Sequence, residues 1–182
     1  MKSTKRRIGF ACALFLLLGA CFVGSGHTTD ARLLENFANH EVEFETLLAE
    51  VRADSGLEML RGDVVRYAGH TFSGQDSLQE AEALGLTRAR WLRYQQQLHA
   101  LGIAQITKTD RVVELTVDDG TMSTGDSYNY KGYEYSILPP RGHRRNSLDG
   151  YRASDEDRVE FGGFSVYKPI KGNWYLYLFA YG

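Results

Sequence analysis

The sequence predicts an α+β fold with a single domain over residues 31–182, in which N-terminal helices precede an antiparallel β-meander of about four to five strands. Two observations support this prediction. Before Gly102 the apolar residues recur with the period of an α-helix. After Gly102 the period changes to two, and the segments become rich in β-branched and aromatic residues. No internal repeat interrupts this order.

The first helix is expected to begin with Asp30 as its N-cap and to run to about Ala53, because Asp is a favoured capping residue. Asp54-Ser55-Gly56 then ends it. One apolar stripe would face the core, made of Leu33, Phe37, Phe44, Leu47, Leu48 and Val51.

The second predicted helix has Thr87 as its N-cap, continues to Leu101 and ends at Gly102, which supplies a left-handed cap. Its buried face would carry Trp91, Tyr94, Leu98 and Leu101. Between the two helices, residues 57–67 are ambiguous, with a possible short strand at 64–67. Residues 69–77 have the composition of a polar loop.

The predicted strands cover residues 103–107, 112–117, 128–137, 159–167 and 174–181. Asp118-Asp119-Gly120 and Lys171-Gly172-Asn173 are turn sequences between strands. Residues 138–157, which contain two adjacent prolines and a basic cluster, are expected to form a long surface loop.

The N-terminal segment begins with four basic residues, Lys2, Lys5, Arg6 and Arg7, followed by an apolar stretch at 8–18. This stretch is shorter than the roughly 20 residues that a membrane-spanning helix needs. Leu18-Gly19-Ala20-Cys21 then resembles the lipobox of bacterial lipoproteins. An ordinary cleaved signal peptide and an uncleaved anchor are the alternatives.

The lipoprotein resemblance implies that residues 1–20 are removed as a signal peptide and that Cys21 carries lipid, including an acyl group such as palmitate. Several acyl chains on one residue anchor a protein stably. Residues 21–30 would form a flexible, lipidated tether. Phe22 follows the cysteine where an inner-membrane lipoprotein of enterobacteria has Asp. The resemblance therefore implies a location in the cell outer membrane, facing the periplasm.

Composition limits the partners of the predicted mature domain. Removal of residues 1–20 leaves 17 basic and 23 acidic residues, a net charge of −6 with neutral histidines. This charge argues against nucleic acid as a partner and against a polybasic membrane anchor. The chain contains two cysteines, Cys12 in the signal segment and the lipidated Cys21. We therefore expect neither a disulfide framework nor thiol chemistry.

A second resemblance covers about the last hundred residues. The resemblance rests on five segments, at 86–91, 101–103, 131–136, 147–149 and 172–177. They include Thr87-Arg88-Ala89-Arg90-Trp91 and Gly172-Asn173-Trp174-Tyr175. These segments resemble a group of uncharacterised small bacterial exported proteins. The resemblance implies no activity.

Catalytic and metal-binding motifs are not evident in the sequence. His40-Glu41 begins like a zinc-protease helix, but Phe44 stands where the second histidine belongs. Ser73 lies near glycines without forming the nucleophile elbow. Asp118 and Asp119 match a solvated turn better than a catalytic pair. The sequence thus predicts no cofactor, no metal site and no catalytic residue.

Two surfaces are candidates for interaction. The first is a basic cluster in the long loop, formed by Arg141, His143, Arg144 and Arg145, which suits an anionic headgroup or an acidic partner but equally a solvated loop tip. The second is the aromatic face of the last strand, formed by Tyr175, Tyr177, Phe179 and Tyr181 and extended by the tyrosines at 128, 130, 133 and 135. Cross-strand packing within the sheet is the alternative for this face.

The sequence therefore predicts a lipid-anchored envelope protein that acts as a non-catalytic binding or interaction module. Its partner would be another envelope protein. One alternative is an immunity or inhibitor protein that neutralises a secreted toxin in the periplasm. A second alternative is a hydrolase of cell-wall or lipid material, which would use Asp118, Asp119 or Glu134 together with a histidine.

Overall fold

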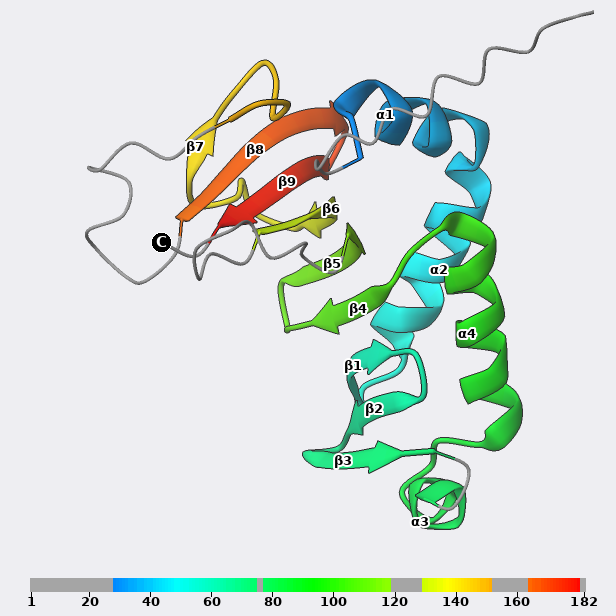
Figure 1. Ribbon diagram of the computed structural model, residues 1–182. Helices are drawn as coiled ribbons and strands as arrows, with labels where there is room; N and C mark the ends of the chain where they lie inside the picture. The colour runs from blue at the N-terminus through cyan, green and yellow to red at the C-terminus, as the bar shows by residue number, and fades with distance from the viewer. Residues whose placement is uncertain (1–27, 75–76, 119–128, 152–163, 181–182) are drawn as a thin grey trace, which may run out of the picture.

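Helices cover one face of a large β-sheet and leave the opposite face without helices, in the residues that the computed structural model describes: 28–74, 77–118, 129–151 and 164–180 (Figure 1). The helices are α1 (Asp30–Asn39), α2 (Glu41–Ala53), α3 (Leu78–Ala83) and α4 (Arg88–Leu101). Within the described residues, none of them is long and apolar enough to cross a membrane. The fold is α+β, as the sequence predicts.

The sheet has nine strands in the described part of the chain, in the order β3-β2-β1-β4-β5-β6-β9-β8-β7. Their bounds are β1 (Leu57–Arg61), β2 (Val64–Tyr67), β3 (His70–Ser73), β4 (Gln105–Lys108), β5 (Val112–Asp118), β6 (Asn129–Ser136), β7 (His143–Arg144), β8 (Phe164–Lys171) and β9 (Trp174–Ala180). All neighbours are antiparallel except β7 and β8, which are parallel. The predicted meander of four to five strands is therefore too small.

The missing strands lie mainly before α4. Residues 57–61 and 70–73, which the sequence left ambiguous or predicted as loop, form β1 and β3 on either side of β2. Val65 and Phe72 are opposite one another and both point into the core. Because β3 is an edge strand with one buried side chain, its composition resembles that of a loop.

The first predicted helix is divided in two. Thr29, and not Asp30, is the N-cap of α1, and its side chain accepts a hydrogen bond from the Arg32 amide. His40 lies between α1 and α2 with φ of −126°, and its own amide bonds back to the last turn of α1. The whole predicted apolar stripe is nevertheless buried, since each half presents its share to the sheet. His40 itself lies at the break and is half-exposed.

The prediction for α4 is confirmed. The Thr87 side chain accepts from the Arg90 amide, Gly102 adopts the left-handed conformation, and the four predicted core residues are buried. The core beneath α1 and α2 is aromatic: Phe37 and Phe44 pack against Tyr133 and Trp174 with ring centroids 4.7–6.1 Å apart. Trp174, Leu176 and Leu178 of β9 face this core, so the tyrosines of β9 face the other way.

Asp30 is not the N-cap of the helix, as predicted, but part of an ion-pair network. It is buried, and its carboxylate lies 2.7 Å from Lys131 Nζ and 3.0 Å from Lys168 Nζ. The Leu148 amide also donates to it, and Lys131 pairs in addition with Asp149. This network joins the start of α1 to β6, β8 and the segment after β7. We infer that it fixes the position of α1 on the sheet.

Candidate functional site

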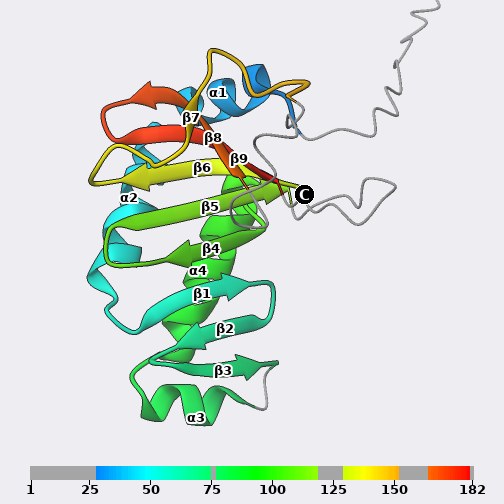
Figure 2. The same ribbon diagram turned by 90° about the vertical axis from the view of Figure 1, so that its left-hand side faces the viewer.

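A connection over the open face of the sheet creates the candidate site. β6 and β7 both run parallel to β8, and β9 and β8 lie between them. The intervening residues 137–142, which we call the strap, must therefore cross one face of the sheet. Because the helices occupy the other face, the strap passes over the open face, in front of β9 and β8 in Figure 2. There it covers part of β9 and β8, near one edge of the sheet.

Gly142 allows the strap to lie directly on the sheet. Its φ is +142°, a value that other residues rarely adopt, and a Cβ at this position would lie 2.5 Å from the Ser165 carbonyl oxygen and 2.6 Å from the Tyr167 ring. A side chain there would push the strap away from Tyr167. The contact thus depends on glycine.

A groove of about 660 Å³ lies between the strap and the sheet. Its floor contains Glu114 of β5, Glu134 and Ser136 of β6, and Tyr167 of β8. One wall is the turn between β4 and β5, and the other is the strap, from Leu138 to Arg141. The groove therefore brings together residues from three separate regions of the sequence, 107–114, 134–141 and 167.

Two glutamates face each other on the floor of the groove. Glu114 and Glu134 are direct cross-strand partners in the β5–β6 ladder, where Cβ atoms lie about 5 Å apart. Glu134 is only 3% exposed. Burial, and then the charge of Glu114, raise the pKa of Glu134 to about 7, while a hydrogen bond with Tyr167 opposes the shift. Burial also raises the pKa of Glu114. Near neutral pH the pair thus holds a proton for part of the time.

The aromatic residues of β9 border this floor. Tyr177 lies opposite Gly132 of β6, which itself lies opposite Thr116 of β5. A Cβ at Gly132 would collide with the Leu115 carbonyl oxygen, so no side chain separates Tyr177 from β5. The Tyr177 hydroxyl therefore reaches Thr116 Oγ1 at 2.6 Å. Burial is the main reason why the pKa of Tyr177 is raised.

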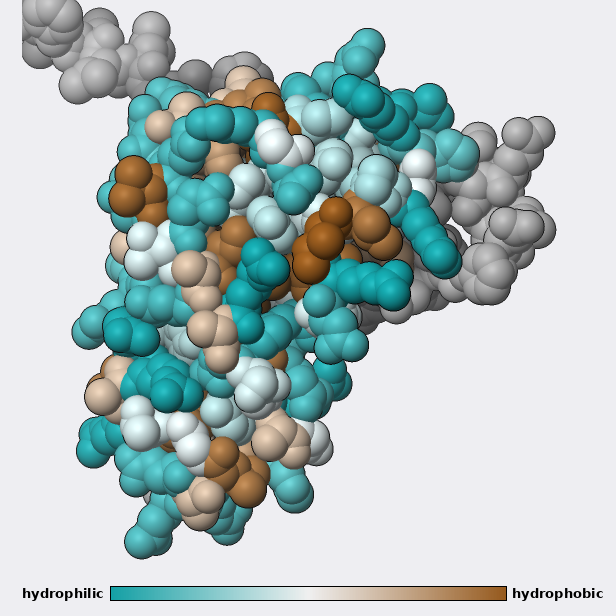
Figure 3. Space-filling view, turned by 180° about the vertical axis from the view of Figure 1, so that it is seen from behind, coloured by the Kyte–Doolittle hydropathy of each residue, from teal (hydrophilic) through white to brown (hydrophobic). Residues whose placement is uncertain are grey.

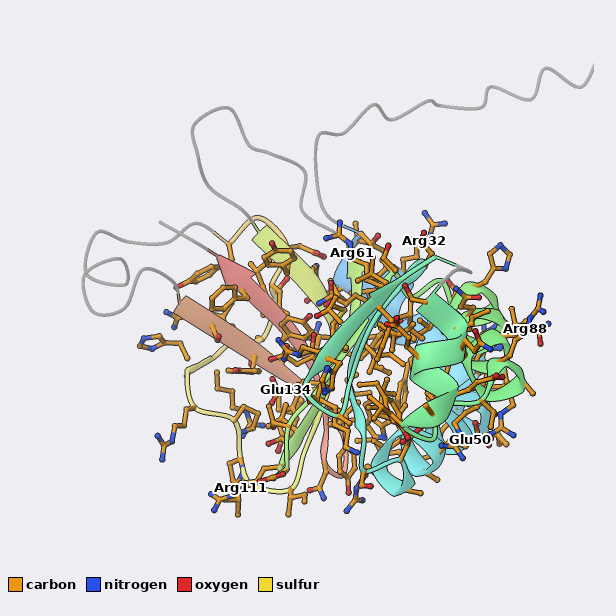
Figure 4. The ribbon with its side chains drawn as sticks, turned by 90° about the horizontal axis from the view of Figure 1, so that it is seen from below. Arg32, Glu50, Arg61, Arg88, Arg111 and Glu134 are labelled. Atoms are coloured by element: carbon orange, nitrogen blue, oxygen red, sulfur yellow. The ribbon has the colours of Figure 1, made fainter. Side chains whose placement is uncertain are left out.

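Two of the three charged side chains at the rim of the groove have the opposite sign to its floor. Arg111, in the β4–β5 turn, and Arg141, on the strap, line the groove and are exposed, together with Asp110. Figure 4 shows Glu134 and Arg111 on the side of the sheet away from Glu50 and Arg88 of the helices. Among the described residues, the ion pairs involve other carboxylates and none includes Glu114 or Glu134.

An apolar side chain forms part of the lip. Leu138, at the start of the strap, lines the groove and is 53% exposed. Figure 3 shows hydrophobic surface gathered near the middle of the face seen from behind, surrounded by hydrophilic residues. The groove thus combines an acidic floor, a mostly basic rim and an apolar entrance.

The structure places the predicted aromatic residues on both faces of the sheet. On the open face, Tyr177 is 4% exposed, whereas Tyr175 and Phe179 are half-buried, and Phe179 stacks on Tyr130. Tyr133 and Tyr135 lie on the helix side and do not extend this surface, because their odd positions on β6 face away from it. Tyr128 and Tyr181 lie outside the described residues.

The members of the predicted basic cluster have different surroundings. Arg141 lines the groove, whereas Arg144 on β7 is exposed and the Arg145 guanidinium lies over the Tyr151 ring, 5.5 Å from its centroid. His143 is exposed on β7. Arg141 therefore belongs to the groove, whereas Arg145 packs against the segment after β7.

Of the acids that the hydrolase alternative named, only Glu134 has a side chain that the structure describes. Glu134 lies in the groove, but the side chain of Asp118, and Asp119 and Cys21 entirely, are outside the description. No histidine is among the residues described as lining the groove, and no group of three or more potential metal ligands occurs in the described part of the chain. Sequence reasoning missed Glu114. The sequence pattern that could have identified Glu114 is the alternation of apolar and polar residues at 112–116. This alternation places Glu114 on the face of the strand opposite Val113 and Leu115.

Comparisons of the chain with protein-family models, with curated proteins and with solved structures find no match.

Proposed function

We propose that this chain is a lipid-anchored protein of the bacterial envelope, on the periplasmic side of the outer membrane, and that it binds its ligand in the groove beneath the strap. The groove is the observation that carries the binding role. A concave site with a few convergent polar groups and groups of shifted pKa is the usual setting of a ligand site. The lipobox-like Leu18-Gly19-Ala20-Cys21 supports the anchor.

The anchor is tested by metabolic labelling with an alkyne fatty acid in a bacterial host. We expect the chain to carry the label and Cys21→Ala to lose it. Equal labelling of both proteins would contradict the lipid anchor. This result is independent of what the groove binds.

The binding role is tested with a photo-crosslinking amino acid placed in the envelope-targeted chain. Leu138, at the lip of the groove, is the test position, and Val42, which is 76% exposed on α2, is the control. We expect an adduct of defined mass from position 138 and none from position 42. Adducts of equal yield at both positions, or none at either, would contradict a ligand site in the groove.

A hydrolase remains the second candidate because one observation favours it. A carboxyl group whose pKa is about 7 suits general acid–base catalysis at neutral pH. Glu134 would then act beside Glu114 and Tyr167, and not beside a histidine as the sequence suggested. Incubation of the purified protein with cell-wall glycan or phospholipid, compared with Glu134→Gln, tests this. Product formation that the variant lacks would establish catalysis, and its absence would leave the binding role.

A further inference from the structure

The floor of the groove has a charge arrangement that the described residues leave uncompensated. Like charges placed directly opposite one another in a sheet are destabilising, and burial increases the cost. Glu114, which is half-buried, and Glu134, which is buried, nevertheless occupy such positions, and none of the ion pairs in the described residues includes either of them. Tyr167 provides one hydrogen bond to Glu134, which does not supply a positive charge.

The cavity beside these carboxyls is large enough for a small ligand, and its rim has a different character. Arg111 and Arg141 are exposed at the rim on opposite walls. They are attached to separate segments, the β4–β5 turn and the strap. A ligand that enters between them would meet positive charge at the rim and negative charge at the floor.

We propose that the groove binds a ligand carrying a protonated amine, which pairs with Glu114 and Glu134, and an anionic group that lies between Arg111 and Arg141. The inference rests on the proposed function, because it names the chemistry of the ligand for the same groove. An ammonium group suits the floor, since it is a compact donor that can bond to both carboxylates and to the Tyr167 hydroxyl.

Proton release accompanies binding in this arrangement. The groups that face Glu134 are Glu114 on β5, its cross-strand partner Tyr175 and also Tyr177 on β9, and Tyr167 on β8. Asp110, Arg111 and Arg141 lie further out. When the ammonium binds, the proton held by the carboxyl pair leaves for solvent and both carboxylates pair with the new cation. Binding must therefore strengthen as pH rises from about 5 to about 8.

The experiment titrates the purified, detergent-solubilised protein with 6-aminohexanoate, followed by NMR chemical shifts. Hexylamine and hexanoate are the comparison probes, since each lacks one of the two charged groups. We expect 6-aminohexanoate to bind in the millimolar range, at least about tenfold more tightly than hexanoate and more tightly at about pH 8 than at about pH 5. Hexylamine should bind with intermediate affinity.

Variants locate the two ends of the probe. Glu134→Gln and Glu114→Gln should each weaken 6-aminohexanoate by about tenfold or more, while Glu35→Gln, an exposed residue of α1, should have no effect. Arg111→Gln with Arg141→Gln should weaken 6-aminohexanoate but not hexylamine. Unchanged binding in Glu134→Gln, equal binding of hexanoate, or no binding of any amine would overturn the inference. The fatty-acid and crosslinking results would stand regardless.

Discussion

Glu134 is the residue on which the description of the groove depends most. Its position on β6 directs it to the open face, the strap and the neighbouring strands bury it, and Glu114 lies opposite. Burial and the charge of Glu114 both favour the protonated form of the Glu134 carboxyl. A surface glutamate on an open antiparallel sheet would have none of them, because water would solvate it.

The stability of the protein should therefore fall with rising pH in a defined range. The folded-state pKa of Glu134 is about 7 and its ordinary value is 4.5, so the folded state holds more protons between these values. The stabilisation is complete below 4.5 and is lost as pH rises through about 7. Glu134→Gln should remove this decline and be more stable than the native chain at about pH 8, by up to about 3 kcal/mol. Urea unfolding across pH checks this.

Glu35→Gln is the matched control for that measurement, because Glu35 is exposed. Its pH profile should follow that of the native chain. Parallel profiles for the native chain and Glu134→Gln would mean that Glu134 is solvated and that the groove lacks a buried acidic floor.

Tyr177 distinguishes a stabilising role from a binding role for the aromatic face of β9. Its ring is buried over Gly132 and its hydroxyl bonds to Thr116. Tyr177→Phe should cost about 1–2 kcal/mol, since it leaves the Thr116 hydroxyl buried with one partner fewer. Tyr177→Ser should cost about 3–5 kcal/mol, as truncation of a buried aromatic residue does.

Thermal or urea unfolding measures both substitutions, and Tyr175→Phe, at a half-buried position, serves as the control with a smaller loss. If Tyr177→Ser lowers the free energy of unfolding by less than about 0.5 kcal/mol, the ring is exposed. The aromatic face of β9 would then again be a candidate interaction surface.

At the level of elements, α1 is fixed to the sheet by charge as well as by its apolar stripe. Burial alone would raise the pKa of Asp30, but Lys131, the Leu148 amide and Lys168 lower it to about 2. Asp30→Ala should destabilise the protein by about 3 kcal/mol or more, because the buried Lys131 then loses its buried partner and keeps only Asp149, which is 42% exposed. Thr29→Ala, which removes only the N-cap, should cost about 1 kcal/mol. Chemical unfolding compares the two, and equal costs would contradict the network.

The elements also show what the sequence can and cannot predict. Both long helical stripes and the Thr87 and Gly102 caps follow from local spacing and local chemistry, and they are correct. The break at His40 has no Pro or Gly to mark it, so the helical period continues across it. β1 and β3 were missed because short strands near a sheet edge bury few side chains. The groove depends on pairing between residues 20 positions apart, which local patterns do not contain.

At the scale of the whole molecule, the two faces of the sheet have different surroundings. The helices and the aromatic core on one face provide the stability of a chain whose proposed mature form has no disulfide. The other face carries the strap and the groove. The proposed lipid at Cys21 would hold this domain at the membrane through the segment before α1. Its net negative charge, together with the acidic floor, would favour the approach of cationic ligands.

The most direct test of this account is the titration of the Glu134 side-chain carboxyl by ¹³C NMR, in the presence and absence of 6-aminohexanoate. Glu134→Gln assigns the signal. The account predicts a pKa of about 7 for the free protein, and a clear decrease when the amine occupies the groove. A pKa near 4.5 in the free protein, or one that does not change at saturating amine, would contradict a buried acidic ligand site beneath the strap.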